Sequence, residues 1–213
     1  MKSASTAAAR GAFSHPTRSV IGFPTNLPPM PDLTEKRLQS EQLVDGALLK
    51  VYRDQAEMPD GSTAVREWID HPGASAIVPL FEDGQTILVQ QFRYPPRRVF
   101  WEVPAGKLDA EGEPPEVVAA RELEEETGWR AHRFDHLGSS YPCIGYSNEV
   151  IHFYLARELE QGQRVLEDHE FMDVEMMPLT KAVAMARQGK IMDMKSVAAL
   201  LFAAAHLNDT APS

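Results

Sequence analysis

Short apolar stretches that alternate with polar residues fill the first half of the chain and predict β-strands. Pro59-Asp60-Gly61 and Glu82-Asp83-Gly84-Gln85 are turn sequences that separate successive stretches. The strands are expected at residues 47–57, 64–70, 74–81, 86–92 and 99–103. Because the turns are short, the pattern predicts antiparallel hairpins.

The pattern changes period at residues 114–127, where Ala119, Ala120, Leu123 and Thr127 form one stripe at helical spacing. Gly128 suits the end of this helix, because glycine readily adopts the left-handed conformation. Strands are then expected at 134–139, 150–156 and 171–176, and helices at 180–188, with Thr180 as N-cap, and at 194–207. Mixed strands with a long central helix and a helical tail predict an α+β sandwich rather than a βαβ array.

Composition and charge narrow the function classes. The 213 residues are 43% hydrophobic and 24% charged, values typical of a globular protein with one domain or one domain and an appendage. A net charge of −10 argues against nucleic acid or an anionic membrane as the main partner. No apolar run approaches the roughly 18 residues of a membrane span. The single cysteine, Cys143, excludes an internal disulfide and favours a reducing, cytoplasmic location.

Residues 1–31 have a different composition from the rest of the chain. They are rich in Ser, Ala and Pro, and no acidic residue precedes Asp32. This composition is typical of a flexible N-terminal extension, and it is also compatible with an organellar transit peptide.

Three glutamates of the predicted central helix point to metal chemistry. Glu122, Glu125 and Glu126 fall within one arc of roughly 100°. Glu122 and Glu126 stand four residues apart near the negative end of the helix dipole, where like charges cost about 0.2–0.5 kcal/mol. No basic residue inside the helix relieves them at that spacing, because Arg130 lies beyond Gly128. A bound divalent cation would remove the conflict, and oxygen ligands suit Mg²⁺ or Mn²⁺. The alternative is a solvated acidic face.

The segment around this helix resembles the signature of the Nudix hydrolases. Gly106, Glu113 and the run Arg121-Glu122-Leu123-Glu124-Glu125-Glu126-Thr127-Gly128 match its fixed positions. Two departures are an extra residue between Gly106 and Glu113, and Trp129 in place of an aliphatic residue. The insertion precedes the helix and leaves the acidic face in register. The resemblance implies a Nudix-type α/β/α sandwich of mixed sheets with an N-terminal antiparallel hairpin.

The resemblance also implies roles for individual residues. The metal ligands would be Glu122, Glu125, Glu126 and the backbone carbonyl of Ala105, with Mg²⁺ as cofactor and Mn²⁺ as an alternative. Arg121 would orient the carboxylates, and Glu125 would also take part in catalysis. The metal would neutralise phosphate oxygens and activate a water for attack.

Blocks on both sides of this segment resemble the ADP-ribose pyrophosphatase branch over about residues 40–207. They include His71-Pro72-Gly73-Ala74, Gln91-Phe92-Arg93-Tyr94-Pro95, Gly145-Tyr146-Ser147-Asn148-Glu149, and Gly189-Lys190-Ile191 before Lys195. The branch implies Mg²⁺-dependent hydrolysis of ADP-ribose to AMP and ribose 5-phosphate. Ile144 stands where many members have Pro, so another nucleoside diphosphate sugar is an alternative substrate. A non-catalytic nucleotide-sugar sensor is a further alternative.

The substrate-binding candidates are Arg66, Arg93, Glu102 and Trp101. Arg93 suits a diphosphate because a guanidinium group binds phosphate oxygens in a bidentate manner, although it also reads as a surface arginine. Trp101 is suited either to stacking on adenine or to core packing.

In the ADP-ribose pyrophosphatase branch that this chain resembles, the general base is a glutamate in the segment before a late strand. That segment is 167–170 here, and Glu170 is the candidate, with Glu167 and Asp168 as substitutes. A solvated acidic turn is the alternative.

Members of this branch are commonly homodimers that exchange an N-terminal sheet. We therefore expect the N-terminal strands at 32–72 to take part in dimer exchange. They would lie between the flexible extension at 1–31 and a Nudix hydrolase domain at 73–208. The exchanged segment would be 43–70.

Overall fold

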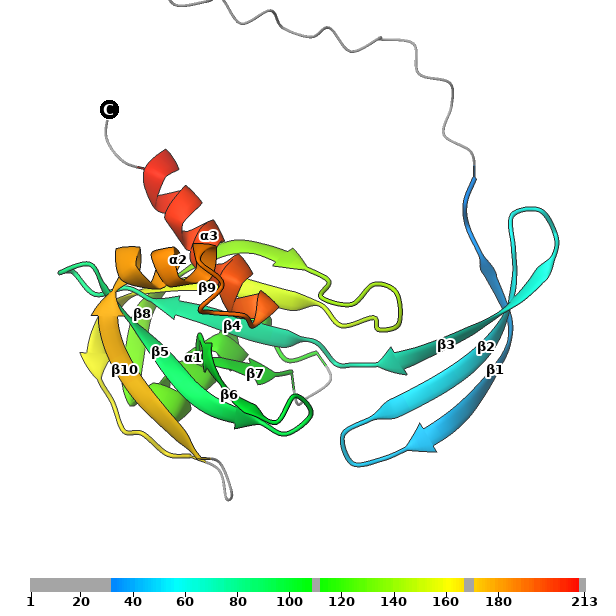
Figure 1. The fold of residues 1–213 in the computed structure, drawn as a ribbon, viewed down its shortest axis with the longest axis horizontal. Helices are drawn as coiled ribbons and strands as arrows, with labels where there is room; N and C mark the ends of the chain where they lie inside the picture. Colours follow the sequence, from blue (N-terminus) through cyan, green and yellow to red (C-terminus); the bar gives the residue numbers. More distant parts are fainter. Residues whose placement is uncertain (1–31, 109–111, 167–170, 211–213) are drawn as a thin grey trace, which may run out of the picture. The chain divides into compact units, whose positions relative to one another are not determined.

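Figure 1 shows the computed structural model, which describes residues 32–108, 112–166 and 171–210. The strands are β1 (Lys36–Asp45), β2 (Lys50–Glu57), β3 (Thr63–Asp70), β4 (Ala74–Pro79), β5 (Gln85–Arg93), β6 (Arg98–Glu102), β7 (Ala105–Lys107), β8 (Trp129–Ser140), β9 (Ile151–Gln161) and β10 (Met172–Pro178). The helices are α1 (Pro115–Thr127), α2 (Leu179–Arg187) and α3 (Met194–Asp209). The expected elements are therefore present, with shifted bounds.

The strands form three sheets. β1, β2 and β3 make an antiparallel meander, and β10, β5 and β6 make a second antiparallel sheet. The third has the order β7-β4-β9-β8, in which β4 and β9 are parallel and the other pairs are antiparallel. These mixed sheets confirm the expected α+β class.

Strand β4 lies at the centre of the layers, because all six of its residues are buried. Side chains on a strand alternate between its two faces. Ala76 and Val78 belong to the core cluster that includes residues of α2 and α3, whereas Ile77 packs in a second cluster with Ala119 and Leu123 of α1. Helices thus cover both faces of this sheet, which confirms the α/β/α sandwich.

The ends of α1 follow the local sequence. Pro115 occupies the first turn, and Gly128 has φ 78° and donates its N–H to the Glu124 carbonyl over 2.7 Å. One position of the expected stripe is wrong: Ala120 is exposed, and Val118 is buried in its place.

The predicted cap of α2 is also wrong. The helix begins at Leu179 after Pro178, without a side-chain cap, so Thr180 lies inside its first turn. The fixed φ of proline already suits the start of a helix.

Strand β1 was not expected as a separate strand. All ten of its residues are exposed, so no buried face marks it in the sequence, and it forms by pairing with β2. Several apolar side chains of its sheet are also exposed, among them Leu38, Leu43, Val44 and Val65. The sheet of β1, β2 and β3 therefore exposes apolar side chains that the core does not bury.

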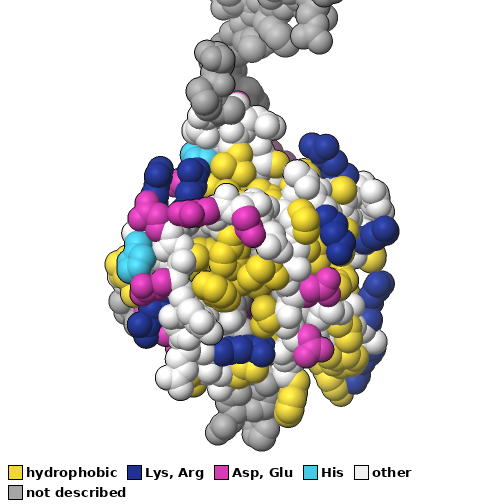
Figure 2. All heavy atoms as spheres, turned by 90° about the vertical axis from the view of Figure 1, so that its left-hand side faces the viewer, with side chains coloured by type: hydrophobic (Ala, Val, Ile, Leu, Met, Phe, Trp, Pro, Cys, Tyr) yellow, Lys and Arg dark blue, Asp and Glu magenta, His cyan; other side chains and the backbone are white. Residues whose placement is uncertain are grey.

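The surface of the main body carries both signs of charge. On the face shown in Figure 2, Lys and Arg side chains are interspersed with Asp and Glu, and apolar side chains gather near the middle. None of the helices in the described parts of the chain is long and apolar enough to cross a membrane.

Candidate active site

Helix α1 carries the three glutamates, and Glu126 is among its buried residues together with Ala119 and Leu123. Ala119 and Leu123 are fully buried and fix the helix against the sheet. Glu126 is only 7% exposed, and the Ala105 backbone N–H donates to its Oε2 over 3.2 Å. The carboxylate of Glu126 is therefore held beside the backbone of β7, the segment that also carries the Ala105 carbonyl.

Gly106 allows the second glutamate to approach the same backbone. A Cβ atom at this position would lie 1.9 Å from Oε1 and 2.0 Å from Cδ of Glu122, far inside any allowed contact. The side chain of Glu122 therefore occupies the space that any other residue at 106 would need.

Arg121 neutralises part of the acidic face. One of its Nη atoms lies 2.8 Å from Oε1 of Glu122 and 3.0 Å from Oε2 of Glu125. The expectation that no basic residue of the helix relieves these carboxylates is thus wrong. Arg121 contacts Glu122, the next residue, and Glu125, four residues further on. One guanidinium still faces three carboxylates, so the face keeps a net negative charge.

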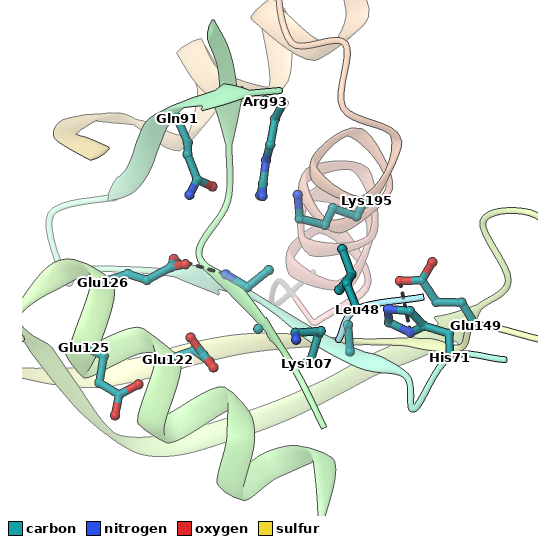
Figure 3. Close-up of a pocket in the computed structure, with 13 residues that line it drawn as sticks. Leu48, His71, Gln91, Arg93, Lys107, Glu122, Glu125, Glu126, Glu149 and Lys195 are labelled. Carbon is teal, nitrogen blue, oxygen red and sulfur yellow. Dashed lines mark hydrogen bonds and ion pairs between the residues drawn. The ribbon is translucent and has the colours of Figure 1, made fainter. Parts of the chain in front are cut away.

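The acidic face lines a cavity of about 550 Å³, shown in Figure 3. Gln91 and Arg93 of β5 and Lys195 of α3 extend into it from the side opposite α1. Anionic and cationic groups thus face each other across one space, an arrangement suited to a cation bound together with a polyanionic ligand.

Arg93 is fixed by a buried carboxylate at the end of β6. Its Nε and Nη2 donate to the two oxygens of Glu102 over 2.7 and 2.6 Å, and the Glu102 side chain is 2% exposed. Burial raises the pKa of Glu102, but the hydrogen bond from Arg93 and the charge of Lys195 outweigh burial and hold this pKa below its usual value. Glu102 therefore stays ionised and orients Arg93.

At the other end of the cavity, His71, Glu149 and Leu48 lie together (Figure 3). The Gly73 N–H donates to Nδ1 of His71 over 3.1 Å, so Nδ1 acts as an acceptor. Oε1 of Glu149 lies 3.8 Å from the same nitrogen. This end of the cavity offers an imidazole Nε2 and a carboxylate, groups able to bind hydroxyls.

The structure brings together most of the predicted site residues. Glu122, Glu125, Glu126, Ala105 and Arg93 line the cavity, and Arg121 and Glu102 contact residues that line it.

Two of the described candidates, Arg66 and Trp101, do not line the cavity. Arg66 binds Glu35 on the N-terminal sheet, with Nη2 and Oε1 2.7 Å apart. Trp101 packs against the main core cluster, because it precedes Glu102 on β6 and neighbouring side chains on a strand point to opposite faces. Glu170 lies outside the described residues, as do Glu167 and Asp168.

Sequence reasoning did not single out several other residues that line the cavity, namely Leu48, His71, Gln91, Lys107, Glu149 and Lys195. Most of them stand inside or beside the blocks that resemble the ADP-ribose pyrophosphatase branch. That resemblance was the available signal, although it assigned them no role.

The cavity fits a divalent cation that keeps open coordination positions. In the parts of the chain that are described, no group of three or more Asp, Glu, His or Cys side chains is arranged to hold a metal ion by itself. Carboxylates and a backbone carbonyl would therefore leave positions for water and phosphate oxygens, as Mg²⁺ prefers.

Comparison with known proteins agrees with this geometry. A family model described as the NUDIX domain matches residues 70–199, and one described as the nucleoside diphosphate sugar hydrolase N-terminal domain matches residues 35–69. The chain therefore belongs to the Nudix family and is a Nudix hydrolase, a class that generally needs a divalent metal.

Individual relatives extend over most of the chain. An ADP-ribose pyrophosphatase of Bacillus subtilis (strain 168) is 37% identical over 175 residues, which are 81% of this chain and 94% of that protein. A GDP-mannose pyrophosphatase of Yersinia enterocolitica is 34% identical over 154 residues, 67% of this chain and 78% of that protein. A solved structure of an ADP compounds hydrolase has a TM-score of 0.72 over 82% of this chain and 95% of that chain, and at 20% identity it shows the fold.

Proposed function

We propose that this Nudix hydrolase cleaves the pyrophosphate bond of ADP-ribose with Mg²⁺, adding water to give AMP and ribose 5-phosphate. The observation that carries the proposal is the single cavity with carboxylates of α1 on one side and Arg93 and Lys195 on the other. The similarity to the Bacillus subtilis ADP-ribose pyrophosphatase supports the choice of substrate.

Each group of residues has a separate task in this proposal. Glu122, Glu125 and Glu126, with the Ala105 carbonyl, would hold the metal, which when bound neutralises phosphate oxygens and polarises phosphorus. Arg121 orients Glu122 and Glu125 through its two contacts.

The remaining groups would bind the substrate and move a proton. Arg93, held by Glu102, would bind the diphosphate through the guanidinium edge that Glu102 leaves free. Glu170 stays our candidate for the general base.

The second candidate function is hydrolysis of another nucleoside diphosphate sugar. It is favoured by the similarity to GDP-mannose pyrophosphatase and by Ile144, which stands in place of proline and is 83% exposed. A non-catalytic sensor is disfavoured, because all three glutamates of the acidic face are present.

Substrate turnover separates these possibilities. Release of phosphate by added phosphatase would be measured for ADP-ribose beside GDP-mannose, UDP-glucose, NADH and diadenosine polyphosphates. We expect the highest kcat/KM for ADP-ribose. A higher kcat/KM for another sugar nucleotide would make that compound the substrate in place of ADP-ribose. Binding of ADP-ribose without any turnover would favour the sensor.

We also propose that the chain acts as a homodimer in the cytoplasm, with residues 43–70 exchanged between copies. Support comes from the fully exposed β1 and from exposed Leu38, Val44 and Val65 on its sheet, which a second copy would bury. Light scattering should give twice the mass of one chain; the mass of a single chain would contradict the dimer.

A further inference from the structure

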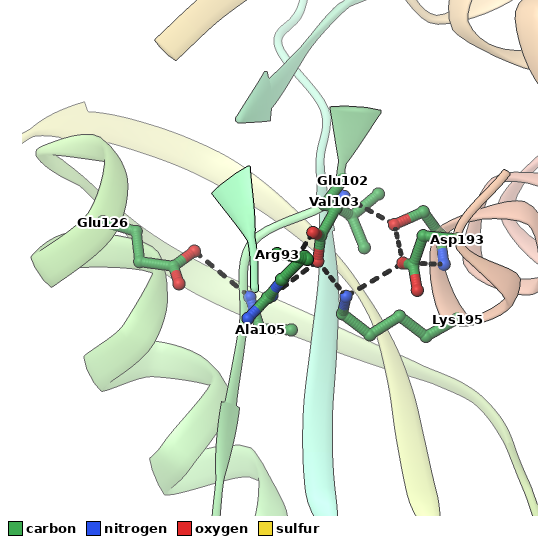
Figure 4. A network of polar contacts seen from close by, with 8 residues as sticks. Arg93, Glu102, Val103, Ala105, Glu126, Asp193 and Lys195 are labelled. Atoms are coloured by element: carbon green, nitrogen blue, oxygen red, sulfur yellow. Dashed lines mark hydrogen bonds and ion pairs between the residues drawn. The ribbon is translucent and has the colours of Figure 1, made fainter. Parts of the chain in front are cut away.

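A lysine at the start of α3 reaches the buried carboxylate that holds Arg93. Lys195 is the second residue of α3, and its side chain is 15% exposed. Its Nζ contacts Oε2 of Glu102 and lies 2.9 Å from Oδ2 of Asp193, as Figure 4 shows. Lysine is rarely this buried unless it is paired, and here both partners are carboxylates.

Glu102 consequently holds two cations at once. Both of its oxygens accept hydrogen bonds from Arg93, and Oε2 also contacts Lys195. The two contacts differ in direction, because Arg93 comes from β5 and Lys195 from α3 (Figure 4). Lys195 therefore fixes the carboxylate from the side opposite to the sheet, and this limits the orientations available to Arg93.

The first turn of α3 is itself held rigidly against the same segment. Asp193 caps the helix by accepting from the Ser196 N–H over 3.0 Å, and the Ser196 hydroxyl accepts from the Val103 N–H over 2.9 Å. Val103 follows Glu102 directly. The position of Lys195 relative to Glu102 is thus set by a helix cap and by a buried backbone hydrogen bond.

The charges of this cluster balance. Arg93 and Lys195 are matched in number by Glu102 and Asp193, although only the two cations line the cavity. Burying ion pairs is costly unless their geometry is good and their remaining hydrogen bonds are satisfied. We therefore expect this cluster to orient the side chain of Arg93 more than it stabilises the folded state.

We infer that Lys195 is a positioning residue for the substrate diphosphate, acting through Glu102 to aim Arg93 into the cavity. This inference rests on the proposed function only in taking a diphosphate as the group that Arg93 binds. It assigns no direct substrate contact to Lys195.

The test is a double-mutant cycle of Lys195→Met and Glu102→Gln in the full chain. The double variant keeps Arg93 and Asp193 as a balanced pair, so it leaves no unmatched charge among these residues. We would measure KM and kcat for ADP-ribose, and the Kd of its α,β-methylene analogue with Mg²⁺ by calorimetry, which needs no turnover. The melting temperature of each variant would be recorded beside these values.

Each single variant should raise KM and Kd about tenfold and change kcat less than about threefold, because a diphosphate contact is present in ground and transition states alike. In the double variant the two effects should not multiply, because both changes act through Glu102. Lys195→Arg should restore most of the affinity by keeping the charge. Lys181→Met, at an exposed lysine of α2 that lies 4.0 Å from Glu175, should leave both constants unchanged.

Effects that multiply in the double variant would show direct contact of Lys195 with the substrate and overturn the inference. A wild-type Kd in Lys195→Met, or a wild-type protein that does not bind the analogue, would overturn it as well. Failure of the proposed function has a different signature: binding of the analogue remains sensitive to Lys195, but ADP-ribose is not turned over.

Discussion

Replacing Gly106 with alanine is a direct way to displace one carboxylate without removing it. The Cβ of alanine would lie 1.9 Å from Oε1 of Glu122, whereas real Cβ contacts below 3.0 Å are essentially unknown. The carboxylate must therefore withdraw by at least 3.0 − 1.9 = 1.1 Å. The backbone itself tolerates the change, since the φ of Gly106 lies outside the left-handed region that requires glycine.

A displacement of this size is large for a group that positions a reaction. Misplacement by about 1 Å can cost on the order of 100-fold in rate. We expect kcat/KM of Gly106→Ala to fall about 100-fold and the Mg²⁺ concentration for half-maximal activity to rise. Stability should change little, because the clash falls on the movable end of one side chain, and alanine in a strand gains about 0.5–1 kcal/mol over glycine.

The assay is ADP-ribose turnover as a function of Mg²⁺ concentration, with a melting curve for each protein. Gly145→Ala is the matched control, because a Cβ there meets nothing within 4 Å. Its Mg²⁺ dependence should match that of wild type. Near wild-type activity and Mg²⁺ dependence in Gly106→Ala would refute the idea that Glu122 must lie against this backbone.

Two further predictions concern pH and packing. Because Arg93 and Lys195 outweigh burial and lower the pKa of Glu102, the folded state gains stability above the unfolded pKa of about 4.3, and this gain is lost as pH falls through the lower folded value. Urea unfolding should therefore show a larger loss between pH 6 and pH 3 in wild type than in Lys195→Met; an equal loss would contradict the assignment. Leu123 is fully buried between α1 and the sheet, so Leu123→Ala should cost about 2–5 kcal/mol of unfolding free energy, and a loss below about 1 kcal/mol would show that this core is loosely packed.

Local sequence patterns located most of the elements, and most plainly those that are buried in the core. The helix at Pro115–Thr127 buries apolar side chains at helical spacing, and the strand at Ala74–Pro79 is a short run that is buried along its whole length, so the local pattern located both. Strand β1 has no buried residue, and β7 is only three residues long. β1 forms by pairing with the next strand, β2, and β7 by pairing with the distant β4, and neither pairing leaves a hydrophobic pattern in the strand itself.

The site divides in a similar way. The acidic face of α1 is local in sequence, and helical spacing alone placed Glu122, Glu125 and Glu126 together. Lys195 stands 93 residues after Glu102 in the sequence, and only the folded chain brings the two side chains together. The residue type of Trp101 fits both stacking and core packing, and in the described part of the chain it packs against the core cluster instead of lining the cavity.

The most direct measurement of the central claim is the Mg²⁺-dependent turnover of ADP-ribose by Glu126→Gln beside Glu124→Gln. Glu126 faces the cavity, whereas Glu124 on the same helix pairs with Arg130 over 2.7 Å and does not line the cavity. Loss of one carboxylate from the metal face should lower kcat/KM about 100-fold or more, since metal assistance supplies several kcal/mol and each 1.36 kcal/mol is tenfold. Glu124→Gln should stay within a few-fold of wild type. Near-full Mg²⁺-dependent activity in Glu126→Gln, or an equal loss in both variants, would contradict the account.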